Sequence, residues 1–345
     1  MVNPHRTRRR LAIVGAALLA LLLASSRSVN RPLPFSGRPV IQKPRTVRLA
    51  PRGMIHPVDR IRIATYNIQD FTDGIGDGTN RTPLQAEHQA EMAARIIAEI
   101  DPDILVLQEI ENTNALSLLL GKLPFSYPLA YLTDFDEQGG RPLNIAVISR
   151  VPLADLRELD FSSLSGPGRP PRGALSFTLE LDPGRKLLAY AIHLKSNFGN
   201  ARKNRSKRYH ALRLIRRDTR RFVRRHPEYE WEIILLGDMN VDPELPKFAR
   251  DYSLRPVRDW IDLWRGVPLA ERVTVPTRRG DPELEFPPAA FDRFIVSTEL
   301  VLPPWTAAVP HVLPVGVDTG NVFVTGGAND IHVSDHYPVF LDLRR

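Results

Sequence analysis

Six short segments of this chain carry polar side chains of the kinds that bind metal ions and move protons. Each lies in or beside an apolar run with strand character: residues 63–67, 105–109, 192–197, 235–240, 291–296 and 334–336. A sheet can gather such side chains from distant parts of a chain, because the ends of its strands meet along one edge. We therefore expect the six segments to form one site.

The residue types in these segments suit the hydrolysis of a phosphodiester. That reaction needs a metal to neutralise phosphate oxygens, an activated water, and a stabilised leaving oxygen. Mg²⁺ prefers oxygen ligands and usually keeps several waters, so one or two carboxylates are enough. Glu109 is the leading ligand candidate, because it follows an apolar strand where an unpaired carboxylate is costly. We expect Mg²⁺ as the cofactor, with Mn²⁺ as the alternative.

Two pairs of residues are candidates for proton transfer. Asp238 and Asn240 stand two apart after an apolar run, and alternate residues of an extended segment point the same way. We expect Asp238 to be the base for the water and Asn240 a neutral donor to a phosphate oxygen. Asp335 and His336 form the other pair, since a carboxylate fixes the tautomer of a histidine and raises its pKa.

Basic residues are concentrated in two stretches. Residues 1–50 hold ten Arg or Lys and no acid, and residues 201–226 hold twelve basic residues and one acidic residue. The second stretch follows the His193 segment and suits a polyanionic substrate, although a solvated helix face is the alternative. We expect phosphate contacts from Lys195 and Asn197, from Arg172, and from four residues of the stretch: Lys203, Arg205, Lys207 and Arg208.

The N-terminus has the pattern of an export signal. Four arginines precede an apolar run over residues 11–24, which small residues follow. The run is shorter than the roughly 20 residues of a comfortable membrane span, which favours a cleaved signal over residues 1–26. An uncleaved N-terminal anchor is the alternative, and is the expected route to any membrane contact. We expect the protein outside the cytoplasm, in the periplasm or extracellular space. The chain has no cysteine, so disulfides and thiolate sites are excluded.

Composition and periodicity divide the rest of the chain in two. Residues 27–58 are rich in Pro and Arg and lack apolar periodicity, which predicts an extended linker. Residues 59–345 alternate strand-like runs with helical patterns. We expect helices over 82–100 and 207–225, and strands over 61–68, 104–108, 144–149, 173–181, 186–193, 232–236, 293–297 and 337–343.

Many strands and few helices predict an α/β fold with two β-sheets packed face to face and helices outside. The loops over residues 71–82 and 274–288 are rich in Gly or Pro and are expected to border the site. We infer no obligate protein partner from the sequence.

The six segments, in this order, resemble the endonuclease/exonuclease/phosphatase superfamily over residues 60–345. The superfamily includes DNase I-like nucleases, exonuclease III-type AP endonucleases, neutral sphingomyelinases and inositol polyphosphate 5-phosphatases. The segment from His193 to Ser196 is similar to that of exported bacterial members. The resemblance implies a four-layer α/β sandwich and a divalent metal.

The resemblance also implies roles for individual residues. Asn67 and Glu109 match metal-side positions, and Asp335 matches a metal or carboxylate position. His193 matches the histidine that contacts the phosphate. The proton-transfer set is matched by four residues: the Asp238–Asn240 pair, the catalytic His336 and the orienting Asp292. Asn144 is the nearest counterpart of the acid that orients His193 in DNase I-like members, and we include it among the expected substrate-binding residues.

Three functions are compatible with these observations. The leading one is an exported, Mg²⁺-dependent nuclease, because the basic stretch beside the site suits nucleic acid. The second keeps the chemistry and acts on a lipid or sugar phosphate, for which residues 301–305 offer the one apolar segment of note. The third is a binding module without activity; the retention of the polar residue in all six segments argues against it.

Overall fold

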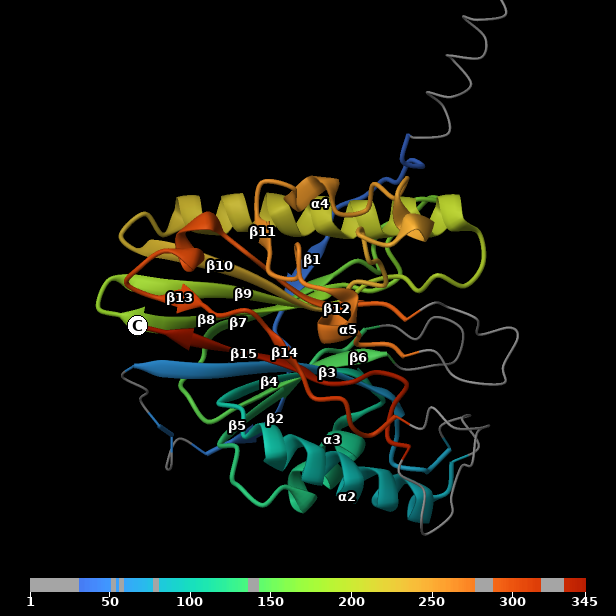
Figure 1. The fold of residues 1–345 in the computed structure, drawn as a ribbon, viewed down its shortest axis with the longest axis vertical. Coiled ribbons are helices and arrows are strands. Elements are labelled where there is room, and N and C mark those ends of the chain that lie inside the picture. The colour runs from blue at the N-terminus through green and yellow to red at the C-terminus, as the bar shows by residue number, and fades with distance from the viewer. Residues whose placement is uncertain are drawn as a thin grey trace, which may run out of the picture.

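The computed structural model describes residues 31–50, 54–55, 59–76, 81–135, 143–276, 288–317 and 332–345. Two β-sheets pack face to face in the middle of the molecule, and helices cover their outer faces (Figure 1). The expected α/β sandwich of two sheets flanked by helices is confirmed. The predicted export signal over residues 1–26 lies outside the described residues, as do most of loop 274–288 and part of loop 71–82.

We name the two mixed sheets after a central strand of each. In the described chain the β10 sheet has the order β1 (Val40–Gln42), β7 (Ala154–Asp160), β8 (Ala174–Asp182), β9 (Arg185–His193), β10 (Glu230–Asp238), β12 (Asp292–Val296), β11 (Ile261–Asp262). The β3 sheet has the order β13 (Thr306–Ala307), β15 (Val339–Arg344), β3 (Arg60–Phe71), β4 (Ile104–Ile110), β6 (Asn144–Ser149), β5 (Leu129–Leu132), β2 (Arg45–Leu49), with β14 (His311–Val312) also paired to β15.

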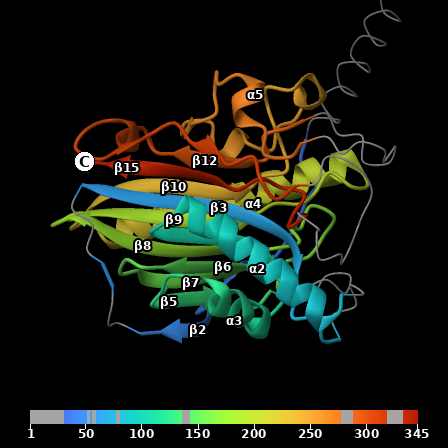
Figure 2. The same ribbon diagram turned by 60° about the horizontal axis from the view of Figure 1, so that its bottom comes forward.

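The helices begin at residues that satisfy their free N–H groups. Helix α2 (Pro83–Ile100) starts with a capping box between Thr82 and Gln85, and α3 (Thr113–Lys122) is capped by Asn112. Both lie under the β3 sheet, while the long α4 (Ala201–Arg225), capped by Asn200, covers the β10 sheet (Figures 1 and 2). Short helical turns are α5 (Leu269–Arg272), η1 (Pro246–Phe248), η2 (Arg255–Val257) and η3 (Thr298–Val301).

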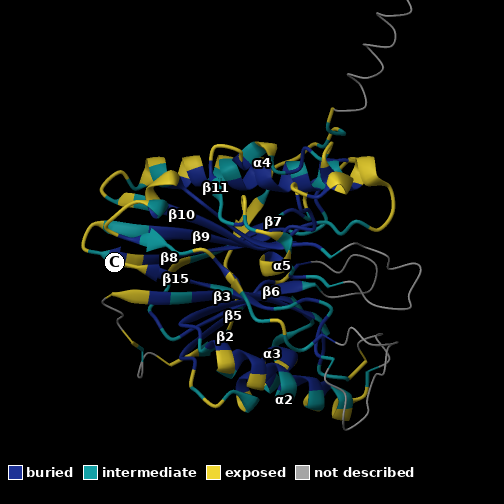
Figure 3. Ribbon diagram, in the orientation of Figure 1, coloured by how far each residue is buried: buried dark blue, intermediate teal, exposed yellow. Residues whose placement is uncertain are grey.

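Three apolar cores follow from this layering. One lies between the sheets, one between the β10 sheet and α4, and one between the β3 sheet and α2 with α3. Strand β10 shows the cause: Ile234 and Leu236 face the other sheet, while Ile233 and Leu235 face α4. A strand covered on both faces is apolar at every position, which is why it reads as a continuous run. Figure 3 shows buried strands inside and exposed outer faces on the helices.

The predicted linker over residues 27–58 was wrong for residues 40–49. Strand β1 pairs with β7 and β2 pairs with β5, so this segment adds an edge strand to each sheet. The side chains of both strands are mostly exposed. Edge strands of this kind are held by backbone pairing to one neighbour, so no apolar alternation marks them in the sequence.

The expected strands and helices are present with shifts at their ends. Besides β1 and β2, the structure adds the strands β5, β7, β11, β13 and β14 and the helices α3 and α5. Helix α4 begins at Ala201 rather than at residue 207, because Asn200 caps it at the end of the His193 segment. Within the chain that the structure describes, no helix is both long and apolar enough to cross a bilayer.

Candidate active site

Three of the predicted residues lie in one row across the β10 sheet. His193 ends β9, Asp238 ends β10 and Asp292 begins β12. In the register of the sheet, Asp238 is paired with His193 on one side and with Asp292 on the other. Side chains that are paired across neighbouring strands point to the same face. The row therefore comes from strand register rather than from nearness in the sequence.

The β3 sheet contributes Asn67 and Glu109 through two irregular strand ends. The pairing of β4 shifts between Gln108 and Ile110, and Glu109 has a left-handed φ of 66°. The pairing of β3 shifts between Asn67 and Phe71. A bulge of this kind turns one side chain away from the regular alternation of the strand. Here it brings the Glu109 carboxylate toward the β10 sheet.

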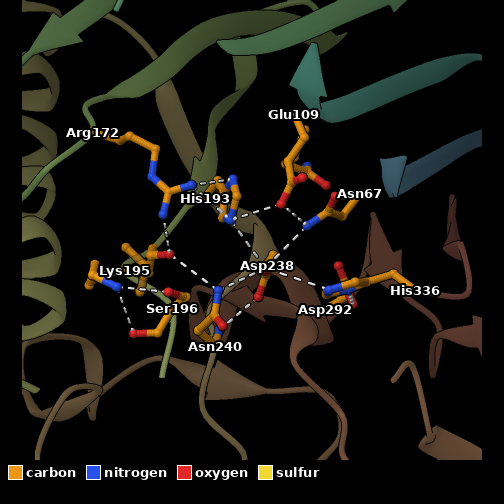
Figure 4. Close-up of polar contacts among 12 residues, drawn as sticks. Asn67, Glu109, Arg172, His193, Lys195, Ser196, Asp238, Asn240, Asp292 and His336 are labelled. Carbon is orange, nitrogen blue, oxygen red and sulfur yellow. Dashed lines mark hydrogen bonds and ion pairs between the residues drawn. The ribbon is translucent and has the colours of Figure 1, made fainter. Parts of the chain in front are cut away.

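Asn67 joins the two sheets at the site. Its Nδ2 donates to Glu109 Oε1 at 3.1 Å and to Asp238 Oδ2 at 3.3 Å (Figure 4). Its Oδ1 accepts the backbone N–H of Gln69, which fixes the orientation of the carboxamide. One buried amide therefore sets the distance between a carboxylate of the β3 sheet and a carboxylate of the β10 sheet.

Asp238 and Asn240 meet through a turn, not through an extended strand as expected. Gly237 has φ 127°, and a Cβ there would lie 2.1 Å from the Ile192 carbonyl oxygen, so a larger residue is excluded. Asn240 has φ 53° and donates from Nδ2 to Asp238 Oδ2 at 2.8 Å and to the Leu194 carbonyl at 3.2 Å. These contacts hold the Asn240 carboxamide beside the Asp238 carboxylate, and donation from Asn240 to a phosphate oxygen stays a prediction.

His336 is anchored by Asp292. The distance from His336 Nδ1 to Asp292 Oδ2 is 2.7 Å, and Nε2 lies 3.9 Å from both Asp238 Oδ2 and Asp335 Oδ1. Asp292 is fully buried, whereas the Asp335 side chain is 39% exposed. The imidazole therefore points its free nitrogen between a buried carboxylate and an open one.

The surroundings of the two histidines shift their pKa values in opposite directions. Burial alone lowers the pKa of His336, but Asp292, Asp238 and Asp335 outweigh it and hold that pKa well above its ordinary value. Burial, followed by the Arg172 cation, lowers the pKa of His193 well below its ordinary value. The site therefore favours the protonated form of His336 and the neutral form of His193.

The pKa values of the two inner carboxylates, Asp238 and Glu109, are raised. Burial raises the pKa of Asp238 to about 7, with His336 opposing and Asp292 adding to the shift. Burial and the Asp335 and Asp70 carboxylates raise the pKa of Glu109. A base whose pKa lies near the working pH is well matched to proton transfer.

His193 is oriented by Arg172 and not by Asn144. Arg172 Nη1 lies 2.7 Å from Nδ1 and 2.9 Å from Nε2 of His193, and Nη2 donates to the Leu194 carbonyl at 3.2 Å. His193 Nε2 is also 3.4 Å from Asp238 Oδ2. Asn144 instead accepts from Thr133 and from the Phe135 N–H within the β3 sheet. Its carboxamide is used to join loops there, so the expected roles beside His193 and in substrate binding are corrected.

The basic residues next to the site divide into two groups. Lys195 donates to Ser196 and the Phe198 carbonyl; burial, Arg172 and Lys207 together lower its pKa to about 8. Burial and Lys203 likewise lower the pKa of Lys207. In the described part of the chain, no carboxylate pairs with Lys195, Lys203 or Lys207. Lys195, Lys203 and Lys207 therefore remain candidates for an external anion.

The second group is used inside the protein. Arg208 is 2% exposed and pairs with Asp251 at 2.7 Å, while it also donates to the Lys195 carbonyl and to Asn197 Oδ1. The structure argues against the expected phosphate contact from Arg208, because its position on the helix faces the body of the protein and its charge is paired with Asp251.

Asn197 and Arg205 make internal contacts as well. Asn197 donates to the Asn240 carbonyl at 2.9 Å, and Arg205 reaches the Arg250 carbonyl at 3.5 Å and the Tyr252 ring at 5.9 Å. These contacts tie the His193 segment and the start of α4 to the loops around them.

Two supporting residues escaped the sequence analysis. Ser334 donates to the Asn67 carbonyl at 2.6 Å and accepts the His336 N–H, so it links the last segment to β3. Thr274 accepts the N–H groups of Phe291 and Asp292. The position of Ser334 next to Asp335 could have indicated a supporting role for it. The local sequence around Thr274 gives no such indication.

The open side of the site fits a divalent cation. The Glu109 side chain is 17% exposed, and the negative charge of Asp335 contributes to its raised pKa. Within the described ranges, no three His, Asp or Glu side chains suffice by themselves to hold a metal. Mg²⁺ needs only one or two carboxylates beside its waters. A cation there would offset the mutual repulsion that raises the pKa of Glu109, so the residues present fit the group.

Comparison with known proteins supports the same fold. Solved structures with similar folds include D. rerio TDP2 complexed with single-strand DNA product (TM-score 0.55, 17% identity, 83% of this chain and 99% of that chain). Others are the endonuclease/exonuclease/phosphatase from Beutenbergia cavernae DSM 12333 (0.54, 20%, 83% and 72%) and a beta toxin from Staphylococcus aureus (0.55, 15%, 81% and 99%). At these identities the likeness concerns the fold.

The sequence comparison identifies the family. No curated protein matches the chain. Residues 64–336, which run from the strand carrying Asn67 to His336, match the model of the Endonuclease/Exonuclease/phosphatase family. Members of that family are typically phosphoric ester hydrolases and generally use divalent metal ions. This chain belongs to the Endonuclease/Exonuclease/phosphatase family.

Proposed function

We propose that this protein is a metal-dependent phosphodiesterase that cleaves nucleic acid. One pairing supports the hydrolase chemistry most directly. Asp238 is a buried carboxylate whose pKa is raised to about 7, and the Nε2 atom of His336, an imidazole whose pKa is raised, lies 3.9 Å from it. One group can take a proton while the other gives one at the same pH. That combination is what general acid–base hydrolysis requires.

Each side chain has a role in this chemistry. Asp238 takes the proton of the attacking water, and Asn67 and Asn240 hold its carboxylate in place. His336 stabilises a phosphate oxygen or protonates the leaving oxygen, with Asp292 fixing its tautomer. Glu109 and Asp335 would hold Mg²⁺ or Mn²⁺. A bound divalent ion would supply positive charge to the phosphate oxygens.

The choice of nucleic acid as substrate rests on the cations around the site. Arg172, Lys207 and Arg208 each add positive potential at Lys195, and Lys203 and Arg169 add it at Lys207. In the part of the chain that the structure describes, no carboxylate pairs with Lys203 or Lys207. Such cations bind phosphates along a polymer without regard to sequence.

A lipid or sugar phosphate is the second candidate substrate. One observation favours it: Leu302, in the apolar segment 301–305, is 55% exposed. Trp305 of the same segment is buried and donates to Asp182 at 2.8 Å, so the segment does not present a continuous apolar surface. The cations near Lys195 therefore carry more weight than this segment.

A substrate panel tests the proposal. The purified chain is incubated with plasmid DNA, RNA, sphingomyelin and inositol phosphates, each with Mg²⁺, Mn²⁺ or EDTA, and His336→Ala serves as the control for contaminating nucleases. We expect cleavage of DNA or RNA that requires the metal. Cleavage confined to sphingomyelin or inositol phosphates would refute the nucleic-acid substrate and leave the phosphodiesterase chemistry intact.

Salt dependence tests the cations directly. A Lys203→Gln/Lys207→Gln variant should raise KM on plasmid DNA. It should also flatten the slope of log binding constant against log salt by about 1.8, since each phosphate contact contributes roughly 0.9. A solvated helix face predicts no change in KM or slope.

We also propose that the protein is exported. The arginines and apolar run of residues 1–24 support this proposal. Sequencing the N-terminus of protein recovered outside the cytoplasm tests it: a cleaved signal predicts a new N-terminus near residue 26. Protein that stays in the cytoplasm with an intact N-terminus contradicts it.

A further inference from the structure

The outer face of α4 carries a row of arginines that the active site does not use. Arg213, Arg217, Arg220 and Arg224 follow one another at spacings of three or four residues, and all are exposed. At 3.6 residues per turn this spacing places them on one side of the helix, roughly 5–6 Å apart. Figure 3 shows the exposed outer face of α4 as the upper surface of the molecule. We call these four residues the arginine row.

The protein itself does not neutralise the arginine row. Asp218 is the one acidic residue of α4, and it is engaged by Arg157 at 3.0 Å and by the Tyr190 hydroxyl at 2.7 Å. The neighbouring Arg216 pairs with Asp259. Within the described residues, no carboxylate pairs with a member of the row. Like charges at this spacing repel and weaken a helix, so the row is suited to an anion from outside.

Two hollows flank the row and are lined by aromatic rings. A groove of about 670 Å³ lies between the row and residues 35–39, with Phe35 and Tyr209 in its wall. A second hollow of about 410 Å³ also contains Arg220 and Arg224, with Trp231 and Trp260 in its wall.

Arginines already stack on two of these rings. The Arg213 guanidinium lies 5.4 Å from the Phe35 ring centroid, and that of Arg216 lies 4.5 Å from the Trp260 ring centroid. The surface thus offers planar groups as well as charge, within a concave and elongated shape.

We propose that the arginine row and its two hollows bind the sugar–phosphate backbone of single-stranded nucleic acid outside the cleavage site. A charged groove that follows the backbone, with aromatic rings for the bases, is the usual design of single-strand binding surfaces. A flat anionic membrane would use the charge but not the hollows. This inference rests on the nucleic-acid substrate proposed above and adds a second contact surface to it.

The position of the row defines its use. Helix α4 begins at Ala201, shortly after the His193 segment. At 1.5 Å per residue, the arginine row lies about 18–35 Å along the helix from Ala201. A long strand can therefore occupy both the site and the row, whereas a short one cannot. The row would favour long polymers by holding them between cleavage events.

Binding without hydrolysis tests the inference. The full chain is titrated into a fluorescein-labelled thirty-nucleotide oligothymidylate in EDTA, and anisotropy is measured between about 50 and 200 mM salt. In Arg217→Gln/Arg220→Gln we expect the salt slope to fall by about 1.4, since a single strand contributes roughly 0.7 per contact. The matched control is Arg221→Gln/Arg225→Gln, which removes the same charge from exposed positions of the same helix outside both hollows. Its slope should change by less than half as much.

Each alternative outcome overturns the inference in a recognisable way. Equal slopes for wild type and the row variant, or equal losses in the row variant and the control, would show that the row does not bind the strand. Loss of binding to phosphatidylcholine–phosphatidylserine vesicles with an unchanged oligonucleotide slope would assign the row to a membrane surface. Urea unfolding of both variants excludes a folding defect.

The same data separate this inference from the proposed function. Because the titration contains EDTA, it reports binding alone. A chain that binds the oligonucleotide through the row but cuts neither DNA nor RNA would refute the proposed function and keep the row. A chain that cuts DNA, with a slope that is insensitive to the row, would refute the row alone.

Discussion

Arg208 and Lys207 are neighbours on α4 that should respond to the same substitution in opposite ways. Arg208 is buried, pairs with Asp251 at 2.7 Å, and makes further bonds to Ser253 and to the Lys195 carbonyl, each at 3.0 Å. Lys207 is partly exposed, and its pKa is lowered by burial and by Lys203 rather than raised by an acid. We therefore expect Arg208→Gln to act on stability and Lys207→Gln to act on substrate binding.

The size of the Arg208 effect follows from what its loss leaves behind. Removing one partner of a buried ion pair costs about 3–5 kcal/mol, because the other charge stays buried and unpaired. Asp251 is 5% exposed in its side chain, so it would be that charge. For a domain of this size each kcal/mol lowers Tm by roughly 2–3 °C, which predicts a fall of about 6–15 °C. Lys207→Gln should stay within about 0.5 kcal/mol of wild type.

Thermal and urea unfolding of the two variants, beside KM on plasmid DNA, distinguishes these roles. We expect Arg208→Gln to unfold early, and Lys207→Gln to unfold normally with a raised KM. If the two variants had equal stability, the buried ion pair would not have the role assigned to it. If Arg208→Gln kept wild-type stability and only raised KM, Arg208 would be the phosphate contact that the sequence first indicated.

Three further predictions concern the metal, the acid–base pair and pH. EDTA should abolish activity and Mg²⁺ or Mn²⁺ restore it, and Glu109→Gln should weaken metal binding in a titration without altering Tm; full activity in EDTA contradicts this. His336→Ala should lower kcat by about 10²–10⁴-fold, and Asp292→Asn by less because Asp292 only orients the ring; steady-state kinetics near wild type would remove His336 from the mechanism. Burial raises the pKa of Asp342, but its bonds to Arg62 outweigh burial and lower it, so the pair stabilises the fold above the ordinary carboxyl pKa and loses that effect as pH falls through the lowered one. Asp342→Asn should therefore be less stable than wild type in urea at neutral pH, with the gap closing in acid; a gap that is constant with pH would contradict the ion pair.

The sequence alone indicated which side chains are suited to phosphoester chemistry and which strands carry them. Glu109 and Asp238 could be chosen because a carboxylate at the end of an apolar run is costly unless it is paired or coordinated. His336 could be chosen because a carboxylate precedes it in the sequence. The runs themselves were visible because a strand covered on both faces is apolar at every position. Burial of a strand is a local property of composition, and so it can be read from a short segment.

The tertiary structure alone decided how polar groups are used. Arg208 looked like Lys207 in the sequence, and only the loop carrying Asp251 made it an internal residue. Asn240 was expected to reach a phosphate, and only the structure shows the left-handed turn that places its amide on Asp238. The role of a polar side chain depends on which distant group forms hydrogen bonds with it, and a local sequence pattern does not identify that group.

The same reason explains the edge strands and Asn67. Strands β1 and β2 have mostly exposed side chains and are held by backbone hydrogen bonds to β7 and β5. The apolar content of a local segment does not predict such backbone pairing. Asn67 was recognised as a site residue, yet its position between Glu109 and Asp238 follows from the packing of two sheets. Sequence determined which side chains could do chemistry; register and packing decided the distances between them, because those are set by contacts far apart in the chain.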